Sequence, residues 1–413
     1  MRFTVSQSSL ADALAIVQKG IASASTLPIL SGVLIKAEDG VLEFQTSNYT
    51  ISTRHRVAAR VDEPGRVVVP CKMLASITKT LPDAPVNFVV EDRQVSITCA
   101  KSSFRLNTLD AVDFPEFPTL ALERSVELPT DILSEMVSRV WRVTSTDKNR
   151  QVLTGVQMTV ENNMLRLVAT DAYRLAVCDT QVETSSLEGS FELIVPSDAF
   201  NDALSIAPAH GTITVGATDN QVVFMAENTT YVARRIEGMF PDYKGLLPDT
   251  CSTSVNLDVS SFNAVLKRVT VVAPSNSAVR FDVDTDANTL TLSAYSSDQD
   301  QASETIETAV GGTNCMVGFN YSYIFGCLNA LGHEKEITLE LTEGRPGVFK
   351  SYDKINYDIC KAVLDVEMSI PAQFVEDVEM GVKGRCAIET CLCSGGNIMS
   401  REAVIEAVKK ILG

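Results

Sequence analysis

The chain has 413 residues, of which 45% are hydrophobic and 21% are charged, and its formal net charge is −17. This length allows two to four domains with real cores. The acidic balance argues against indiscriminate binding to nucleic acid but leaves room for a local basic surface. No apolar run approaches the ~18 residues of a membrane-spanning helix, and the first residues alternate as a strand does, so we expect no signal peptide.

The ten cysteines give no sign of a disulfide framework, because most of them stand far apart in the sequence. We therefore expect reduced thiols in a cytoplasmic protein. Cys386, Cys391 and Cys393 do cluster, but three cysteines with no nearby histidine fall short of a structural zinc site. The sequence predicts no metal and no cofactor.

One pattern begins at Phe3 and returns at Val126 and Val255: a short alternating strand, a few polar residues and then a helix. The helices keep one apolar face in register at the spacing i, i+4, i+7. The members of this face are Leu10, Leu14 and Val17, then Leu133, Val137 and Val140, then Phe262, Leu266 and Val269. The candidate N-caps are Ser9, Thr130 and Ser261.

A second helix is predicted later in each repeat, where a short apolar strand (68–70, 194–196 and 316–319) runs directly into helical spacing. Alternating runs predict antiparallel strands at 32–36, 41–45, 86–90, 95–99, 155–160, 165–169, 213–215, 222–226, 290–294 and 337–341. Each repeat is thus an α+β unit of two helices and about eight strands. The markers occur in the same order in each repeat. This order favours a triplicated unit and speaks against three unrelated α+β domains.

The domain boundaries follow from these markers. We predict a first domain at 1–122, a central domain at 123–250, a third domain at 251–370 and a divergent extension at 371–413. Phe-Pro elements at 114–115 and 240–241 precede the first two crossings, where Pro ends a strand. In the extension, residues 400–412 have the pattern of an amphipathic helix.

The stretch 167–177 places two apolar runs on either side of Thr170 and Asp171. Thr and Asp side chains bond nearby backbone groups and favour a turn. An exposed Tyr-Arg-Leu beside such a turn has the composition of a partner-binding anchor. Local chemistry alone allows either an ordinary hairpin or a binding site.

Several of these elements together resemble the bacterial sliding clamp family, the beta subunit of the replicative DNA polymerase holoenzyme. The resemblance covers residues 1–357 and rests, in order, on residues 26–30, 114–115, 168–177, 240–243, 318–323 and 328–331. It implies three clamp domains, each with two helices packed against antiparallel sheets, and a six-domain ring of two chains around duplex DNA. It also implies a non-catalytic processivity factor that tethers the replicative polymerase and other DNA-processing proteins.

A ring that slides needs sequence-blind attraction to phosphates rather than contacts with bases. The resemblance places helices on the inner wall, and the predicted helices and the loop 147–151 carry scattered cations. The DNA-facing candidates are Lys19, Lys72, Lys79, Arg139, Arg142, Lys148, Arg150, Lys267 and Arg268. Each helical cation fits equally well as a charge that stabilises a helix C-terminus. Residues 23–25 lack a cation that some relatives carry, and the loop 147–151 also departs from relatives.

In the family, the polymerase, the clamp loader, and repair and translesion factors insert a short linear peptide into an apolar pocket beside the second domain. The matching residues here are Leu153, Thr170, Ala172, Tyr173, Arg174, Leu175, Val177, Pro241 and Leu246, with Asn320 and Tyr323 on the third-domain side. The slot would accept Leu or Phe side chains, while Arg174 and backbone groups orient the peptide. Without the resemblance, the aliphatic members of this set would be assigned to the core. The apolar Met-Pro-Met-Arg-like ending that helps to floor the family's pocket is not found after residue 357.

Closing a ring requires two unlike ends to meet. The candidates on an edge strand of the first domain are Phe104, Arg105, Leu106 and Leu109, and those in the third domain are Val271, Val272, Asp298, Asp300 and Glu304. Strand addition with opposite charges would join them, and the alternative is two edges blunted by charge.

Three functions remain open at this point: a clamp, a degenerate clamp with an impaired peptide pocket, and an α+β metal-dependent hydrolase that uses scattered Asp residues. An enzyme needs convergent acid, base or nucleophilic groups. The three histidines, His55, His210 and His333, fall in different repeats, and no phosphate-binding Gly loop or metalloprotease motif appears. We therefore expect a non-catalytic homodimeric clamp whose partners are duplex DNA, itself and short peptides, with no membrane association.

Overall fold

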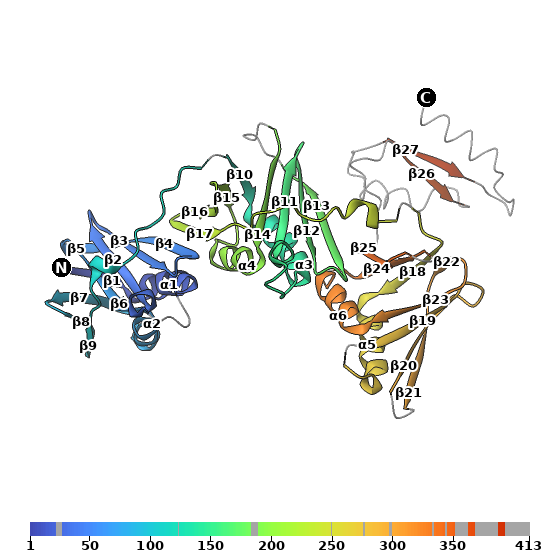
Figure 1. Cartoon of the computed structure of the whole chain (residues 1–413), viewed down its shortest axis with the longest axis horizontal. Coiled ribbons are helices and arrows are strands. Elements are labelled where there is room, and N and C mark those ends of the chain that lie inside the picture. The colour runs from blue at the N-terminus through green and yellow to red at the C-terminus, as the bar shows by residue number, and fades with distance from the viewer. Residues whose placement is uncertain are drawn as a thin grey trace. The chain divides into compact units, whose positions relative to one another are not determined.

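The computed structural model describes residues 1–21, 27–122, 124–182, 189–248, 250–275, 277–296, 300–332, 334–342 and 345–351, and the backbone of β26 (Ala362–Glu367) and β27 (Ala387–Leu392). The chain forms two compact units (Figure 1): unit 1 is Met1–Leu247 with Asn320–Ala330, and unit 2 is Pro248–Phe319 with Leu331–Gly413. Every helix within the described residues is too short or too polar to span a lipid bilayer.

The same order of elements occurs three times, which confirms the predicted repeat. The first repeat contains β1 (Arg2–Ser6), α1 (Gln7–Val17), β2 (Gly32–Glu38), β3 (Val41–Ser47), β4 (Ile51–Ala58), β5 (Arg60–Glu63), β6 (Gly65–Pro70), α2 (Cys71–Thr80), β7 (Pro85–Glu91), β8 (Gln94–Cys99) and β9 (Ser102–Asn107). The second contains β10 (Arg124–Pro129), α3 (Thr130–Val140), β11 (Gly155–Glu161), β12 (Met164–Thr170), β13 (Leu175–Gln181), β14 (Phe191–Pro196), α4 (Ser197–Ile206), β15 (Thr212–Ala217), β16 (Gln221–Ala226) and β17 (Thr229–Arg234). The third contains β18 (Thr253–Asp258), α5 (Val259–Val269), β19 (Ala278–Asp284), β20 (Thr289–Tyr295), β21 (Gln301–Glu307), β22 (Val310–Gly312), β23 (Cys315–Asn320), α6 (Tyr321–Ala330), β24 (Glu336–Leu341) and β25 (Val348–Ser351).

Short 3-10 helices extend the first helix of each repeat: η1 (Gln18–Gly20), η4 (Trp141–Val143) and η7 (Thr270–Val272). Others lie in the connections: η2 (Pro28–Ser31), η3 (Ala111–Asp113), η5 (Gln151–Thr154) and η6 (Lys244–Leu246). The 3-10 turn tightens the end of a helix and supplies partners for its last carbonyls.

Each repeat contributes strands to two antiparallel sheets. Those of the first two repeats include the orders β5-β1-β7-β8-β9 and β13-β12-β11-β14, and those of the third are β22-β18-β24-β25 and β21-β20-β19-β23. The remaining strands of the first two repeats form one continuous sheet of eight, β10-β15-β16-β17-β4-β3-β2-β6, and the helices α1 to α4 lie along one side of it (Figure 1). The two repeats meet in this sheet through β17 and β4, which we call the internal seam. Tyr231 lies opposite Thr53 there, and Val232 lies opposite Ser52.

The helical faces predicted from the i, i+4, i+7 spacing are buried in all three repeats. In the first repeat, Leu10, Leu14 and Val17 pack into a core where the rings of Phe3 and Phe88 stack 4.6 Å apart. Burying such side chains removes apolar surface from water, at roughly 1.5–3 kcal/mol for each large residue. The hydrophobic period therefore identified the helices and their inward faces correctly.

The predicted N-caps are wrong. Ser6 caps α1, since its hydroxyl accepts a bond from the Ser9 backbone N–H, and Asp258 caps α5 by accepting from the Ser261 N–H at 2.7 Å. The cap lies three residues before the residue whose N–H it binds. At α1 and α5 the prediction therefore named the residue that donates its N–H instead of the residue that accepts it. These backbone bonds to its carboxylate hold the pKa of Asp258 below its usual range.

Candidate functional site

The stretch 167–177 is a β-hairpin whose turn is fixed by its own polar side chains. The Thr170 hydroxyl donates to the Arg174 carbonyl at 2.8 Å and accepts from the Ala172 N–H at 3.1 Å. One Asp171 carboxylate oxygen accepts from the backbone N–H groups of Tyr173 and Arg174 at 2.9 and 3.0 Å. Ala172 takes a positive φ of 78°, which is uncommon for a residue with a Cβ. These bonds hold the turn in one conformation and carry Tyr173 outward, with its side chain 76% exposed.

Arg174 points the other way, and its side chain is only 26% exposed. Its Nε donates to Asp171 at 2.9 Å, and one terminal nitrogen donates to the Arg142 carbonyl at 3.1 Å. Its Cζ lies 5.1 Å from the centre of the Tyr323 ring on α6. The ring of Tyr173 is 6.4 Å from the same Tyr323 ring. The turn is thus attached both to the end of α3 and to α6.

An apolar surface adjoins this turn. Val168, Ile194, Ile236, Phe240 and Tyr243 form a small buried cluster, and Leu175 packs against it half-buried. Of the predicted pocket residues, Leu153 is buried, whereas Val177, Pro241 and Leu246 are exposed. The alternative assignment of the aliphatic residues to the core is therefore correct for Leu153 and wrong for Leu246. Asn320 bonds the Ser322 N–H and hydroxyl at the start of α6.

Sequence reasoning missed four residues at this site. Met239 and Leu247 are exposed apolar residues beside Phe240 and Leu246, and their exposure could have been expected from their Pro-rich and Gly-rich surroundings. Asp171 was recognised only as a turn former, although it also binds the Arg174 side chain. Gly326 was missed altogether, and an isolated glycine inside a helical pattern was the signal available.

The predicted DNA-facing cations fall into two groups. Four form ion pairs: Lys19 with Asp202 at 2.7 Å, Arg139 with Glu135 at 2.7 Å, Arg150 with Asp147 at 3.0 Å, and Arg268 with Glu304. Hydrogen bonds from Arg268 hold the pKa of the Glu304 carboxyl below its usual range. Lys72, Lys79, Arg142, Lys148 and Lys267 are exposed and have no carboxylate partner among the described residues.

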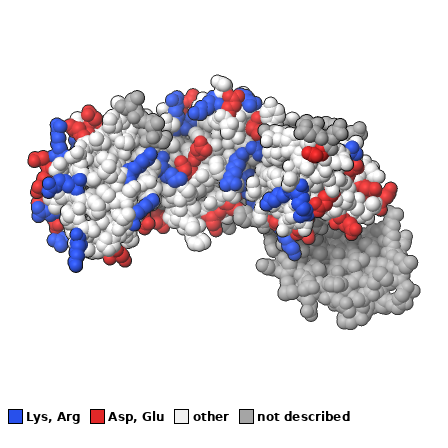
Figure 2. Space-filling view, turned by 90° about the horizontal axis from the view of Figure 1, so that it is seen from below, with Lys and Arg blue, Asp and Glu red and all other residues white. Residues whose placement is uncertain are grey.

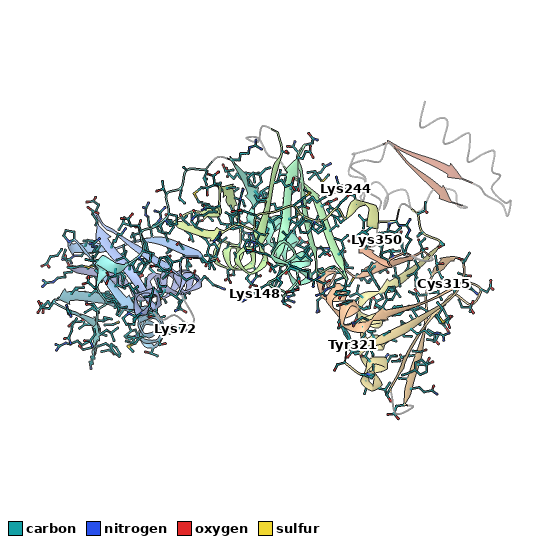
Figure 3. The ribbon with its side chains drawn as sticks, in the orientation of Figure 1. Lys72, Lys148, Lys244, Cys315, Tyr321 and Lys350 are labelled. Atoms are coloured by element: carbon teal, nitrogen blue, oxygen red, sulfur yellow. The ribbon has the colours of Figure 1, made fainter. Side chains whose placement is uncertain are left out.

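Figure 2 views the molecule from the side on which the helices of unit 1 lie, and Lys and Arg side chains are prominent there among uncharged ones, with some acidic residues between them. Lys72 and Lys148 both lie on this helical side of unit 1 (Figure 3). The α4 helix contributes acidic charge instead, through Asp198 and Asp202. The helical side is therefore mixed in sign rather than uniformly basic.

The two predicted ring-closing segments are edge strands. β9 ends the order β5-β1-β7-β8-β9, and β21 begins the order β21-β20-β19-β23. Phe104 and Leu106 are half-buried against the core of the first repeat, and Arg105 faces outward. Asp300 precedes β21 and its carbonyl accepts a bond from the Ser296 backbone N–H, and Asp298 lies outside the described residues.

The prediction that Leu109 belongs to the edge strand is wrong, because the strand that holds Phe104 and Leu106 ends before it. β9 ends at Asn107, and Leu109 forms an isolated bridge with Val68 and packs beside Leu34 and Phe114. The Thr108 backbone N–H still bonds the Arg93 carbonyl beside β8, whereas the Leu109 N–H bonds the Val68 carbonyl, so the chain changes its partner strand at Leu109. Val271 and Val272 lie in η7 at the end of α5, as predicted, and Val271 is 81% exposed.

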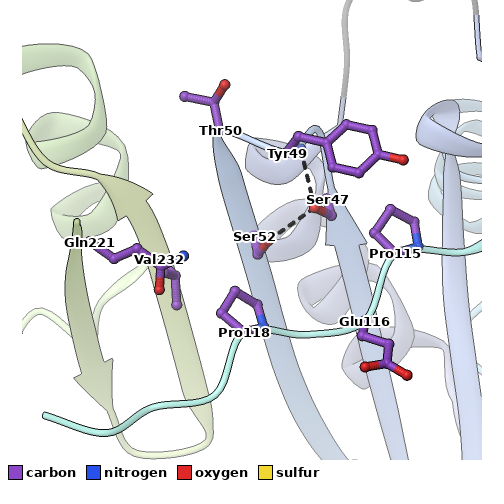
Figure 4. A pocket seen from close by; sticks show the side chains of 9 residues that line it. All are labelled: Ser47, Tyr49, Thr50, Ser52, Pro115, Glu116, Pro118, Gln221 and Val232. Carbon is purple, nitrogen blue, oxygen red and sulfur yellow. Dashed lines mark hydrogen bonds between the residues drawn. The ribbon is translucent and has the colours of Figure 1, made fainter. Parts of the chain in front are cut away.

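A pocket of about 270 Å³ lies elsewhere in unit 1, beside the internal seam (Figure 4). Pro115, Glu116 and Pro118 of the chain that links the first two repeats form one side of it, and Tyr49 at the turn between β3 and β4 forms another. No sequence prediction pointed to this place.

Among the described side chains there is no cluster of three that could hold a metal ion, and the six cysteines are free. Burial raises the pKa of the Cys71 thiol to about 12, so this thiol stays protonated and unreactive near neutral pH. His55 bonds Thr229 across the internal seam at 2.9 Å, and burial lowers its pKa. His333, the Cys386–Cys391–Cys393 cluster side chains, residues 23–25 and the helix predicted at 400–412 lie outside the part of the chain that the structure describes.

Comparison with known proteins agrees with this architecture. Models of the N-terminal, central and C-terminal domains of the DNA polymerase III beta subunit match residues 1–118, 127–242 and 244–365. The boundaries that we predicted at 122, 250 and 370 remain predictions.

Among curated proteins, the beta sliding clamp homolog GriR of Streptomyces muensis is 33% identical over 334 residues, which is 80% of this chain and 88% of that protein. The beta sliding clamp of Streptomyces coelicolor is 28% identical and covers 86% of this chain and 96% of its own.

Solved structures are similar over nearly their whole length. The Bacillus subtilis DNA polymerase sliding clamp superposes with a TM-score of 0.80 at 26% identity, covering 86% of this chain and 96% of that one. The Thermotoga maritima DNA polymerase III beta subunit gives 0.79 at 27% identity, covering 85% and 96%. These matches confirm the resemblance and the fold of three clamp domains. With its three repeats matched in order, the chain belongs to the DNA polymerase III beta subunit family and is a DNA sliding clamp, a non-catalytic processivity factor rather than an enzyme.

Proposed function

We propose that two copies of this chain join head to tail into a ring around duplex DNA, and that the ring holds polymerases and other DNA-processing proteins through short peptides. The main support for this proposal is the internal seam. There, edge strands of two successive repeats pair within one chain, and the ring needs the same kind of pairing between two chains. Heterologous contacts of this kind close into rings when the rotation between copies permits.

The edges that would join the two copies correspond to the two strands of the internal seam. The order β4-β3-β2-β6 matches β21-β20-β19-β23, so β21 corresponds to β4. The order β10-β15-β16-β17 matches β1-β7-β8-β9, so β9 corresponds to β17. β9 and β21 are edge strands with unpaired backbone groups on one side. We infer that β21 of one chain pairs with β9 of its partner as β4 pairs with β17.

The internal seam also predicts the register of this inter-chain pairing. Phe104 corresponds to Tyr231, since they lie opposite Ile97 and Phe224 at matching places in their sheets. Counted from the first residues of β2 and β19, Ala302 corresponds to Thr53. Because Tyr231 lies opposite Thr53, we expect Phe104 to lie opposite the partner's Ala302.

A cysteine pair tests ring closure and register together. In a chain with Cys251→Ser, Phe104→Cys combined with Ala302→Cys should give a disulfide-linked dimer under mild oxidation, seen on a non-reducing gel. Residues directly opposite in antiparallel strands have Cα atoms about 4.5–5.5 Å apart, within reach of a disulfide. The matched control is Phe104→Cys with Ser303→Cys, whose side chain leaves the opposite face of the strand. A chain that is monomeric by light scattering, or equal cross-linking in both pairs, would contradict the proposal.

Duplex DNA is the proposed contents of the ring, held without regard to sequence. The support is the set of exposed cations on the helices, their ends and the loop 147–151, namely Lys72, Lys79, Arg142, Lys148 and Lys267. Acidic residues such as Asp202 on α4 weaken the attraction, which suits a ring that must slide. The proposed place of action is the cytoplasm.

Salt dependence distinguishes the two groups of cations. A plot of log K against log salt has a negative slope. Lys72→Ala should make this slope shallower by about 0.9, because one phosphate contact is lost. Lys19→Ala should change the slope less, since Asp202 already holds its ammonium group at 2.7 Å. Asp202→Asn should raise affinity for a short duplex, measured by fluorescence anisotropy. Equal slopes for Lys19→Ala and Lys72→Ala would show that this division of the cations is wrong.

The partner site is the proposed peptide pocket of the turn 171–174, Leu175, Pro241 and Leu246. Its support is an exposed apolar surface next to a turn that its own hydrogen bonds hold in place. Titration with a labelled peptide that carries Leu-Phe, against an Ala-Ala peptide as control, tests it. Equal binding of the two peptides, or no binding by an intact dimer, would favour a degenerate clamp.

A further inference from the structure

Gly326 occupies a position in α6 at which the corresponding helix of the second repeat carries an acidic residue. Asp202 is the sixth residue of α4 and Gly326 is the sixth residue of α6. Asp202 receives the Lys19 ammonium group from η1. At Gly326 an arginine from a different element takes this place, because a Cβ there would lie 2.5 Å from a terminal nitrogen of Arg174. The bare helix backbone is what lets Arg174 lie against α6.

Three contacts hold the Arg174 guanidinium within the protein. Its Nε binds Asp171, a terminal nitrogen binds the Arg142 carbonyl, and its face lies over the Tyr323 ring. Tyr173, the next residue, is exposed and its ring lies 6.4 Å from that of Tyr323. An aromatic pair with one ring in solvent offers an apolar wall for an incoming side chain.

We propose that Arg174 and Gly326 are positioning residues for the peptide site. Arg174 fastens the turn 171–174 to α6 through the gap at Gly326, and the rings of Tyr173 and Tyr323 make the contact with a Leu or Phe side chain of the peptide. This inference rests on the proposed peptide function and assigns different roles to neighbouring residues within it. Arg174 then acts through α6 rather than by binding the peptide.

A double-mutant cycle on the full-length chain separates these roles. With the labelled Leu-Phe peptide, Gly326→Ala should weaken binding about fivefold, because Cβ displaces the guanidinium. Arg174→Ala should cost about fivefold in the native background and less than twofold in the Gly326→Ala background, where the fastening is already lost. Leu246→Ala is the control, and it should cost the same in both backgrounds because Leu246 belongs to η6 and takes no part in the contact between Arg174 and Gly326. The melting temperature of Gly326→Ala should stay level or rise, since Ala is the better helix former.

Each outcome decides between the proposals. No peptide binding by the native chain would overturn the proposed function itself. If the native chain binds and Leu246→Ala weakens it, but Gly326→Ala binds as the native chain does, only the present inference is overturned. An equal cost of Arg174→Ala in both backgrounds would make Arg174 a direct peptide ligand and would also overturn it. Should Gly326→Ala fail to fold, the cycle is repeated with Tyr323→Leu, which removes the platform under the guanidinium, and with Tyr323→Phe, which keeps it and should leave the cost of Arg174→Ala unchanged.

Discussion

Replacing Val271 by aspartate is expected to convert the dimer into monomers. Val271 is 81% exposed in its own chain, so the substitution costs that chain little stability. Val271 lies in η7 as Lys19 lies in η1, and Lys19 reaches α4 beside the internal seam. The helix α2 corresponds to α4 and presents the exposed Met73. Burying an uncharged polar group without a hydrogen bond costs roughly 2–7 kcal/mol, and an ionised carboxylate between these apolar groups costs more. The dimer dissociation constant should therefore rise at least ~100-fold.

Light scattering over a dilution series measures this effect. The control is Val41→Asp, at the start of β3 and away from both edge strands, which should leave the dimer intact. Phe104→Asp should open the ring from the other edge, but Phe104 also packs against its own core, so its melting temperature must be followed as well. A Val271→Asp chain that stays dimeric at low concentration would remove η7 from the interface.

Truncating Tyr173 and Leu246 together is expected to abolish most peptide binding. Both side chains are exposed, so neither replacement by Ala leaves a cavity in the fold. Anchors of this kind contribute about 1–2 kcal/mol each, and losing two should weaken binding roughly 30- to 1,000-fold. Fluorescence anisotropy with the labelled Leu-Phe peptide measures the affinity, and light scattering should show an unchanged dimer.

Tyr49→Ala is the matched control for this variant. Tyr49 is 68% exposed and lines the pocket beside Pro115 (Figure 4), and it is not part of the proposed peptide pocket. Its removal should leave peptide affinity within about twofold of the native value, because residues outside the anchor positions are close to neutral for binding. Binding that survives in Tyr173→Ala with Leu246→Ala would place the peptide elsewhere.

The repeated fold could be predicted because each element depends on local patterns. The apolar spacing of Leu10, Leu14 and Val17 follows directly from helix geometry, and alternation follows from strand geometry. The N-caps were misplaced because Ser6 and Ser9 are both capable residues, and only the backbone conformation decides which one accepts the bond. Leu109 was misplaced because the end of β9 is set by pairing with β8 and by the bridge to Val68.

The candidate site was predictable in composition but not in orientation. Thr170 and Asp171 predicted the turn, and the exposure of Tyr173 could be expected from its place in that turn. The inward direction of Arg174 depends on Gly326, which belongs to a different repeat, and no local pattern reports such a contact. Likewise, the pairing of Lys19 with Asp202 joins residues 183 positions apart, so an apparently available cation proved to be engaged. The absence of the family's usual ending concerns residues outside the described part of the chain.

The internal seam also shows that one repeat can join another through two unlike edges. A unit with a β4-like edge on one side and a β17-like edge on the other can add copies of itself indefinitely, because each addition exposes a fresh edge. Such a unit ends in one of two ways, as a closed object or as an open filament, and the angle between successive copies decides which. Mutations that alter this angle without weakening the pairing would therefore produce fibres rather than monomers, a failure that a test of stability alone would overlook.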